Sequence, residues 1–262
     1  MHVPESQLRA AFGPAIDLLA RNGIDLTKQC VEVAPIAHYH MGGIRVNDRM
    51  QSRVPGLYAA GEAVGGANGA NRLSGNALPE ALVFGERAGR FASSEVAGMA
   101  TAWSAAAAAP VLGLIETIND RAAKASPTET CGTTKMWTEL QQLMWRDVGL
   151  MRTDASLNAA LRRIREMRSK DLPNISPSPG MEFNSTIEEW FELRNSLLVA
   201  EMIAAAALNR KESRGAHQRI DFPNTETDFE LNQVLSMEGE QFSHRWIPVT
   251  TSVSAPQAAG AE

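Results

Sequence analysis

The sequence predicts an α/β segment followed by a mostly helical domain, and two stretches of its 262 residues carry this prediction. Residues 38–91 combine short apolar runs with glycine-rich loops, a pattern typical of strand ends beside ligand-binding loops in α/β sheets. Residues 111–209 hold successive candidate helices, and 154–170 has apolar residues on one side and charges on the other. A chain of this length can bury a good core in one or two domains.

The composition argues against several classes of protein. The formal net charge of −5 disfavours a nucleic-acid-binding surface. No apolar run approaches the roughly 20 residues of a membrane span, and the polar first residues, MHVPESQLRA, do not resemble a signal peptide. Cys30 and Cys131 lack the spacing of zinc or iron–sulfur ligands. One disulfide stays open, but a reducing cytoplasm is the simpler expectation.

The amino-terminal residues predict one helix and an irregular connection. Apolar residues recur at helical spacing over 5–21, and Asn22-Gly23 is a typical stop. Residues 24–37 follow, where Pro35 cannot donate to a sheet ladder.

Short motifs then follow one another closely. HYHMGG (38–43) places two histidines before a glycine pair, and the alternation predicts that His38 and His40 share one face of a strand end. We expect short strands at 44–46 and 57–60, the second of them apolar and buried. Glu62 follows that strand at the kind of position where α/β sheets bind nucleotides.

Residues 66–76 form a loop rich in glycine and asparagine that holds a single arginine, Arg72. A helix is predicted over 78–92, buried on most sides because its apolar and small residues suit close packing. Its amino-terminal amides could face an anionic ligand. Ordinary packing of the helix on a sheet is the alternative.

The rest of the chain is predicted to be helical. Residues 99–110 are low in complexity and predict a linker. The expected helices cover 111–125, 134–151, 154–170 and 185–209. For the last of them, Ser185 and Glu188 fit a capping box, and Gly215 fits the stop after Arg214. The tail from residue 251 is expected to be disordered.

These motifs resemble a known family. HYHMGG, VPGLYAAGE (54–62), GANGANRLSGNALPEALVFGERAGR (66–90), MWRDVGLMR (144–152) and RKESRGAHQRIDFPN (210–224) are similar, in order, to segments of the succinate dehydrogenase, fumarate reductase and L-aspartate oxidase flavoproteins. The resemblance implies part of an FAD-binding, glutathione-reductase-like domain, preceded by the end of a capping domain and followed by a helical domain. The implied boundaries are 1–36 for the capping end, 37–98 for the flavin domain, 99–110 for the linker, 111–250 for the helical domain and 251–262 for the tail.

The resemblance also implies roles for individual residues. His38 and Arg72 match family residues that bind a substrate carboxylate, and a guanidinium can grip a carboxylate with two parallel bonds. Glu62 matches a glutamate that accepts hydrogen bonds from sugar hydroxyls of FAD. The backbone of Asn76, Ala77 and Leu78 matches the loop that lies against the isoalloxazine ring. Ala77 departs from the family's frequent serine at that position, and Asn68 stands where many relatives have histidine.

Other candidate residues are weighed against simpler roles. The pair His38 and His40 could bind a metal, but no third ligand has suitable spacing, so we expect no metal. Arg214 and His217 invite a catalytic interpretation, yet a structural role at the end of a helix is favoured. No residue is assigned as the catalytic acid, because the family's proton-delivering arginine belongs to a capping region whose motif is not visible here. The family's GxGxxG fingerprint is also not visible.

The implied protein is the carboxyl-terminal part or split subunit of an FAD-dependent oxidoreductase. It would transfer hydride between flavin N5 and a carbon next to a carboxylate. Fumarate or succinate is the expected substrate, while L-aspartate, a 3-ketosteroid or another unsaturated acid stays open. Expected partners are an amino-terminal flavoprotein half with the dinucleotide fingerprint and an iron–sulfur electron-transfer subunit, through which the chain could associate with a membrane. The alternative is a scaffold or vestigial subunit without activity.

Overall fold

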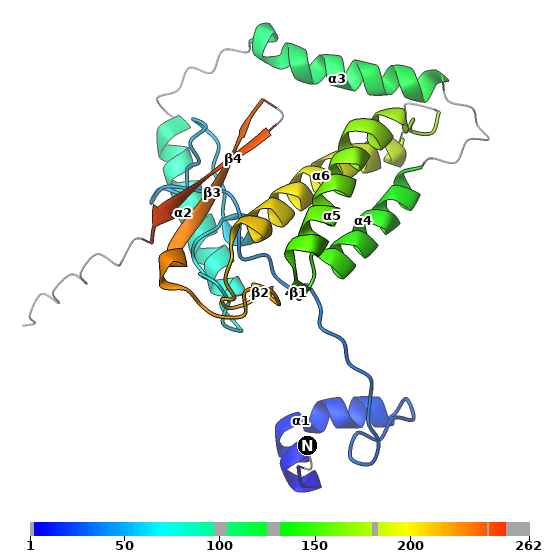
Figure 1. Cartoon of the computed structure of the whole chain (residues 1–262), viewed down its shortest axis with the longest axis vertical. Coiled ribbons are helices and arrows are strands. Elements are labelled where there is room, and N and C mark those ends of the chain that lie inside the picture. Colours follow the sequence, from blue (N-terminus) through cyan, green and yellow to red (C-terminus); the bar gives the residue numbers. More distant parts are fainter. Residues whose placement is uncertain (1–2, 97–103, 125–131, 180–182, 240, 250–262) are drawn as a thin grey trace, which may run out of the picture. The chain divides into compact units, whose positions relative to one another are not determined.

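The computed structural model describes residues 3–96, 104–124, 132–179, 183–239 and 241–249 (Figure 1). Two compact units make up the chain, Met1–His40 and Met41–Glu262. The expected tail 251–262 and Cys131 lie outside the described residues, whereas Cys30 is an exposed free cysteine.

The first unit contains the predicted helix. Helix α1 (Glu5–Ala20) leaves helical geometry at Phe12, two residues before Pro14, which cannot continue the hydrogen-bond ladder. Gly23, at φ +80°, donates its N–H to Ala20 O (3.0 Å), and the next N–H bonds Leu19 O (3.0 Å). These bonds satisfy carbonyls at the helix end. The stop predicted at Asn22-Gly23 is therefore confirmed.

Residues 41–96 hold irregular backbone, a single 3₁₀ turn η1 (Gly61–Ala63) and helix α2 (Ala77–Val96). The prediction of strands at 44–46 and 57–60 is wrong. Ile44 forms an isolated parallel bridge with Val64, and Tyr58 forms an isolated antiparallel bridge with Gln51. A strand needs a neighbouring strand to hydrogen-bond with, and the described part of 41–96 offers only these single contacts.

Helix α2 extends the predicted 78–92 at both ends, but its expected burial is wrong. Leu78, Leu82 and Val83 are 75%, 73% and 58% exposed, and Glu80 is the buried residue of the helix. An apolar helix face is buried only when another element covers it. The closest packing of α2 is against the short turn η1, which is too small to cover that face.

The main core lies in the helical part. It is built by α3 (Ala105–Lys124), α4 (Thr133–Asp147), α5 (Asp154–Glu166) and α6 (Ser185–Asn209), of which α4, α5 and α6 lie side by side in Figure 1. A π-helical turn, η2 (Met167–Asp171), and a 3₁₀ turn, η3 (Leu172–Asn174), continue from α5. The fully buried core residues include Leu157, Ile164, Met167, Leu193 and Leu197.

Two helix boundaries differ from those expected. Helix α3 begins at Ala105, so the second half of the predicted linker 99–110 is helical. Alanine has the highest helix propensity, and Ser104 Oγ caps the helix by accepting the N–H of Ala107 (3.2 Å). Together these two stabilising effects outweigh the cost of Pro110 inside the helix. Helix α4 ends at Asp147 rather than 151, because Val148 leaves helical geometry with φ −122°.

Helix α6 has the predicted bounds but different caps. Its N-cap is Asn184, whose Oδ1 accepts the N–H of Thr186 (3.1 Å), instead of a Ser185–Glu188 capping box. The helix ends at Asn209 because Arg210 is extended. Gly215 therefore does not stop α6 and lies in a later turn.

The helical domain also carries strands that were not expected. Strands β1 (Met151–Arg152) and β2 (Gln218–Arg219) pair in parallel. Strands β3 (Leu231–Glu238) and β4 (Gln241–Pro248) form an antiparallel hairpin in which Leu231 faces Pro248. The domain predicted to be helical over 111–250 therefore also contains an antiparallel hairpin that the sequence analysis did not include.

Candidate functional site

Two glycines, Gly43 and Gly65, let residues 43–44 lie directly on the turn that carries Glu62. Ile44 N–H donates to Ala63 O (2.7 Å), and Gly65 N–H donates to Ile44 O (3.2 Å). A Cβ atom on Gly65 would lie 2.8 Å from the backbone nitrogen of Gly43, closer than real Cβ atoms approach. Both backbones therefore need glycine to meet at this distance.

Glu62 occupies the middle of η1, directly after the predicted strand 57–60. Gly61 adopts φ +66° and is buried, and a Cβ on it would meet Ala81 of α2 at 3.5 Å. The turn thus packs on α2 while the Glu62 side chain stays exposed. An exposed carboxylate can accept bonds from hydroxyl groups of a bound molecule.

The loop 66–76 leads into the amino terminus of α2. Asn68 Nδ2 donates to Glu80 Oε2 (2.8 Å), and Glu80 N–H donates to Asn76 O (3.1 Å), so the loop folds over the first turn of the helix. Ala77 and Leu78 contribute backbone N–H groups to that turn, while Pro79 has none. The side chain of Asn76 is exposed.

Arg72 is half-buried within this loop. Its backbone N–H donates to Met41 Sδ (3.0 Å), and its Nη1 atom makes a long contact with Leu73 O (3.4 Å). The backbone at Arg72 is thereby fixed to the glycine-pair segment, which begins at Met41.

The two predicted carboxylate-binding residues fall in different units. His38 is exposed in the unit Met1–His40, and Arg72 belongs to Met41–Glu262. Their joint role stays a prediction. His40 was considered as a metal ligand together with His38. The described residues contain no group of three histidine, cysteine or acidic side chains that could hold a metal ion.

The Arg214 side chain forms hydrogen bonds within its own unit. Its Nε and Nη2 atoms donate to the two carboxylate oxygens of Glu212 (2.9 and 3.0 Å). Glu212 is fully buried and also accepts bonds from Arg210 and from Glu226 N–H (3.0 Å). Burial raises the pKa of Glu212, but the bonds from Arg214, Glu226 and Arg210 outweigh it and leave the pKa below its usual value.

His217 is held in one protonation state by its neighbours. Its Nδ1 lies 2.8 Å from Arg152 Nη1 and its Nε2 lies 3.0 Å from Arg210 O. Since a guanidinium can only donate, Nδ1 accepts and Nε2 carries the hydrogen. Burial and the nearby arginines lower the pKa of His217. These contacts favour the structural interpretation of Arg214 and His217.

Arg219 was not singled out in the sequence. It is fully buried, donates to both oxygens of Asp221 (2.8 Å each), and bonds Asp154 and Ala207 O (3.0 Å). The Arg219 bonds hold the pKa of Asp221 well below its usual range. In the sequence, the only local indication of this cluster is that Arg219 and Asp221 have opposite charges two residues apart.

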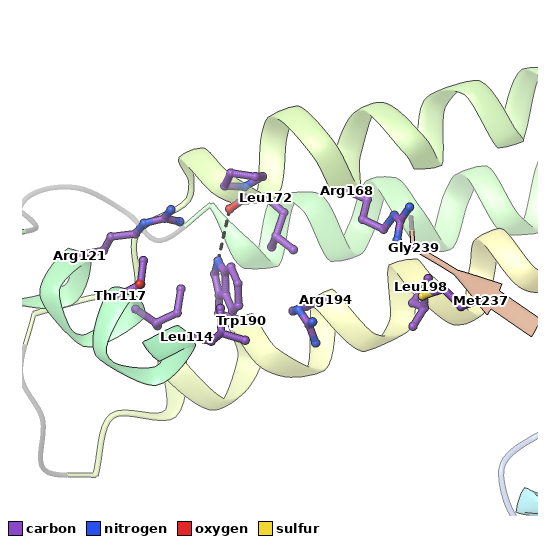
Figure 2. Close-up of a pocket in the computed structure, with 12 residues that line it drawn as sticks. Leu114, Thr117, Arg121, Arg168, Leu172, Trp190, Arg194, Leu198, Met237 and Gly239 are labelled. Atoms are coloured by element: carbon purple, nitrogen blue, oxygen red, sulfur yellow. Dashed lines mark hydrogen bonds between the residues drawn. The ribbon is translucent and has the colours of Figure 1, made fainter. Parts of the chain in front are cut away.

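A pocket of about 410 Å³ lies elsewhere, between α3, η3, α6 and the hairpin (Figure 2). Arg121, Arg168 and Arg194 line it with apolar residues, and Trp190 Nε1 donates to Leu172 O (3.3 Å) at its wall. None of the predicted site residues lines this pocket. It is therefore not part of the predicted flavin site.

Two protein-family models match the chain. "Fumarate reductase flavoprotein C-term" matches residues 137–259, and "FAD binding domain" matches residues 1–78. A fumarate reductase (CoM/CoB) subunit of Methanothermobacter marburgensis is 34% identical over 239 residues, which is 91% of this chain and 42% of the relative. L-aspartate oxidase 2-b of Nicotiana tabacum is 35% identical over 241 residues, which is 89% of this chain and 36% of the relative.

A solved structure shows the same fold. A variant of E. coli quinol fumarate reductase FrdA superposes with a TM-score of 0.80 at 30% identity, and the match covers 97% of this chain and 44% of that chain. The fold and these matches define a flavoprotein whose cofactor is FAD.

The chain belongs to the succinate dehydrogenase, fumarate reductase and L-aspartate oxidase flavoprotein family. The family, the fold class and the cofactor predicted from the sequence are thus confirmed. The chain spans about two fifths of the length of these relatives, 42% and 36% respectively. Within the described part of the chain, no helix is both long and apolar enough to cross a membrane.

Proposed function

We propose that this chain supplies the substrate-binding and ring-facing part of an FAD-dependent oxidoreductase of the fumarate reductase and succinate dehydrogenase type. The observation that carries the proposal is the placement of Arg72. It is half-buried in a loop whose backbone is tied to Met41 (3.0 Å), and this loop leads directly into the exposed start of α2. A guanidinium in such a loop can hold a substrate carboxylate beside a ligand bound at the helix terminus.

The start of α2 fits a flavin. It combines backbone N–H groups at Ala77 and Leu78 with the exposed apolar side chains of Leu78 and Leu82. An isoalloxazine ring has an apolar face and polar edges, so it needs this mixture of partners. Glu62, exposed on the turn that packs against α2, would accept hydrogen bonds from the sugar hydroxyls of FAD.

FAD, when bound, supplies the hydride chemistry at its N5 atom. Arg72 and His38 would fix the substrate by its carboxylates and polarise the carbon–carbon bond beside them. No residue of this chain is assigned to deliver the proton. Fumarate or succinate is the proposed substrate, because two clamping residues suit a dicarboxylic acid. L-Aspartate carries the same two carboxylates and would satisfy the same clamp.

The proposed enzyme also needs a dinucleotide-binding portion carrying GxGxxG, which residues 1–262 do not show. The exposed apolar residues of α2 give that portion a surface to cover. An iron–sulfur subunit is the proposed electron partner, by analogy with the fumarate reductase relatives. Its contact surface on this chain is not assigned.

The test replaces Arg72 in the assembled flavoprotein. Arg72→Ala should lose about 2–4 kcal/mol of transition-state stabilisation, as expected when one preorganised donor is removed. Arg72→Lys should restore only part of the activity because it lacks the planar fork. The measurement is kcat/KM for fumarate with a reduced dye, normalised to bound FAD. Arg53→Ala, at an exposed position of the same segment, is the matched control. An unchanged kcat/KM in Arg72→Ala would contradict the proposal.

A further inference from the structure

The loop that carries Arg72 is pressed against a turn of the helical part of the same unit. Ala216 N–H donates to Ala70 O (2.9 Å), two residues before Arg72. Gly215 has φ +58°, and a Cβ atom there would lie 2.5 Å from the carbonyl carbon of Ala70 and 2.8 Å from its Cβ. Any side chain at residue 215 would therefore have to displace the backbone at Ala70.

The turn itself is firmly held. Arg214 N–H donates to His217 O (2.8 Å), and His217 N–H donates back to Arg214 O (3.0 Å). The Arg214 guanidinium grips the buried Glu212, and the His217 ring bonds Arg152 and Arg210 O. The turn is thus a rigid surface for the loop rather than a part that yields to it.

The other side of the loop is held as well. Arg72 N–H donates to Met41 Sδ at 3.0 Å. The backbone from Ala70 to Arg72 is therefore hydrogen-bonded at two points, to the turn at Gly215–Ala216 and to the side chain of Met41. These two bonds set the position of the Arg72 Cα atom, from which the guanidinium extends.

We propose that Gly215, Ala216 and Met41 are positioning residues for Arg72. They would set where its guanidinium meets the substrate carboxylate without touching substrate themselves. This inference rests on the proposed carboxylate-binding role of Arg72. It gives the segment RGAH a function in substrate binding that is exerted through the loop at Ala70.

The main experiment introduces Gly215→Ala into the assembled flavoprotein. Since a displacement of about 1 Å can cost on the order of 10²-fold in rate, kcat/KM for fumarate should fall by about that factor, with a raised KM and full FAD content. Gly239→Ala is the matched control: Gly239 has a similar φ of +63°, yet no atom lies within 4 Å of the position that a Cβ atom would take there. The control should keep its kcat/KM, because it shares the backbone strain and lacks the collision.

A double-mutant cycle separates positioning from general damage. In an Arg72→Ala background, Gly215→Ala should change kcat/KM little further, whereas any loss in Tm should persist. Additive losses in kcat/KM, or a Gly215→Ala enzyme with unchanged kcat/KM and KM, would overturn the inference. If Arg72→Ala alone has no effect, the proposed function fails instead.

A second variant covers the case in which Gly215→Ala does not fold. Met41→Leu keeps the side-chain volume and removes the sulfur acceptor. It should raise the KM for fumarate in the wild-type background and leave it unchanged in the Arg72→Ala background. An unaltered KM in Met41→Leu would contradict the positioning role.

Discussion

His217 lies among cations that fix it in the neutral form. Arg152 donates to its Nδ1 (2.8 Å), and the positive charges of Arg210 and Arg219 lie nearby. Charging the ring would place an N–H donor against a guanidinium that can only donate. The histidine is therefore suited to holding the turn at 214–217 rather than to exchanging protons with substrate.

The protonation state of His217 predicts a pH dependence of stability. Because its pKa is lowered in the folded protein, the unfolded chain binds the proton more readily. The free energy of unfolding should therefore be highest above the ordinary histidine pKa of about 6.5 and fall as the pH drops through it. Urea denaturation between pH 8 and pH 5 measures this slope. His217→Gln should flatten it and His244→Gln, at an exposed position on β4, is the control. Equal slopes in wild type and His217→Gln would refute the prediction.

Glu62 should affect cofactor binding more than substrate binding. Glu62→Ala would remove the proposed hydrogen bonds to sugar hydroxyls, which are worth about 1.5–3 kcal/mol to a charged acceptor. In the assembled flavoprotein, FAD content at limiting FAD should fall while KM for fumarate changes little. Absorbance of released flavin measures the content, and Glu86→Ala on the exposed side of α2 is the matched control. Full occupancy in Glu62→Ala would count against this role.

Residues of the candidate site could be suggested from the sequence because they lie in one short stretch with a recognisable order. Glu62, Arg72 and the start of α2 follow one another within 17 residues, 62–78. The ionic partners could not be foreseen. Arg219 bonds Asp154 across 65 residues, and neither residue has a local pattern that names the other.

At the scale of the elements, local signals were sufficient where the helix core forms. The predicted helix 185–209 has the bounds of α6, and the apolar side of 154–170 predicts α5 with its π-helical continuation. Elements that depend on a distant neighbour were wrong or missing. The segments 44–46 and 57–60 make single bridges, and the hairpin of β3 and β4 depends on pairing across its turn.

The helix core predicts how α6 responds to substitution. Leu197 is fully buried between α6 and its neighbours, so Leu197→Ala should lower the free energy of unfolding by about 2–5 kcal/mol. Val199→Ala, at a position of α6 that is 47% exposed, is the matched control and should cost about 0.5 kcal/mol or less. Urea denaturation followed by far-UV circular dichroism measures both. Similar costs for the two variants would contradict the assignment of the core.

At the scale of the whole chain, burial is uneven. The helical part has a continuous core. Residues 41–96 bury the apolar side chains of Met50 and Val64 but expose apolar side chains along α2. Such exposed apolar surface commonly marks a binding or interaction face. In the proposed enzyme, FAD and the dinucleotide-binding portion would cover it.

The most direct test of this account is FAD binding by residues 1–262 alone. The central claim is that this chain contributes one wall of a flavin site and lacks the turn that holds the pyrophosphate. The purified chain is titrated with FAD, and bound flavin per chain is measured after gel filtration, with circular dichroism confirming that the helices are folded. We predict a helical protein that retains far less than one FAD per chain. A folded chain that binds FAD stoichiometrically and reduces fumarate would contradict the account.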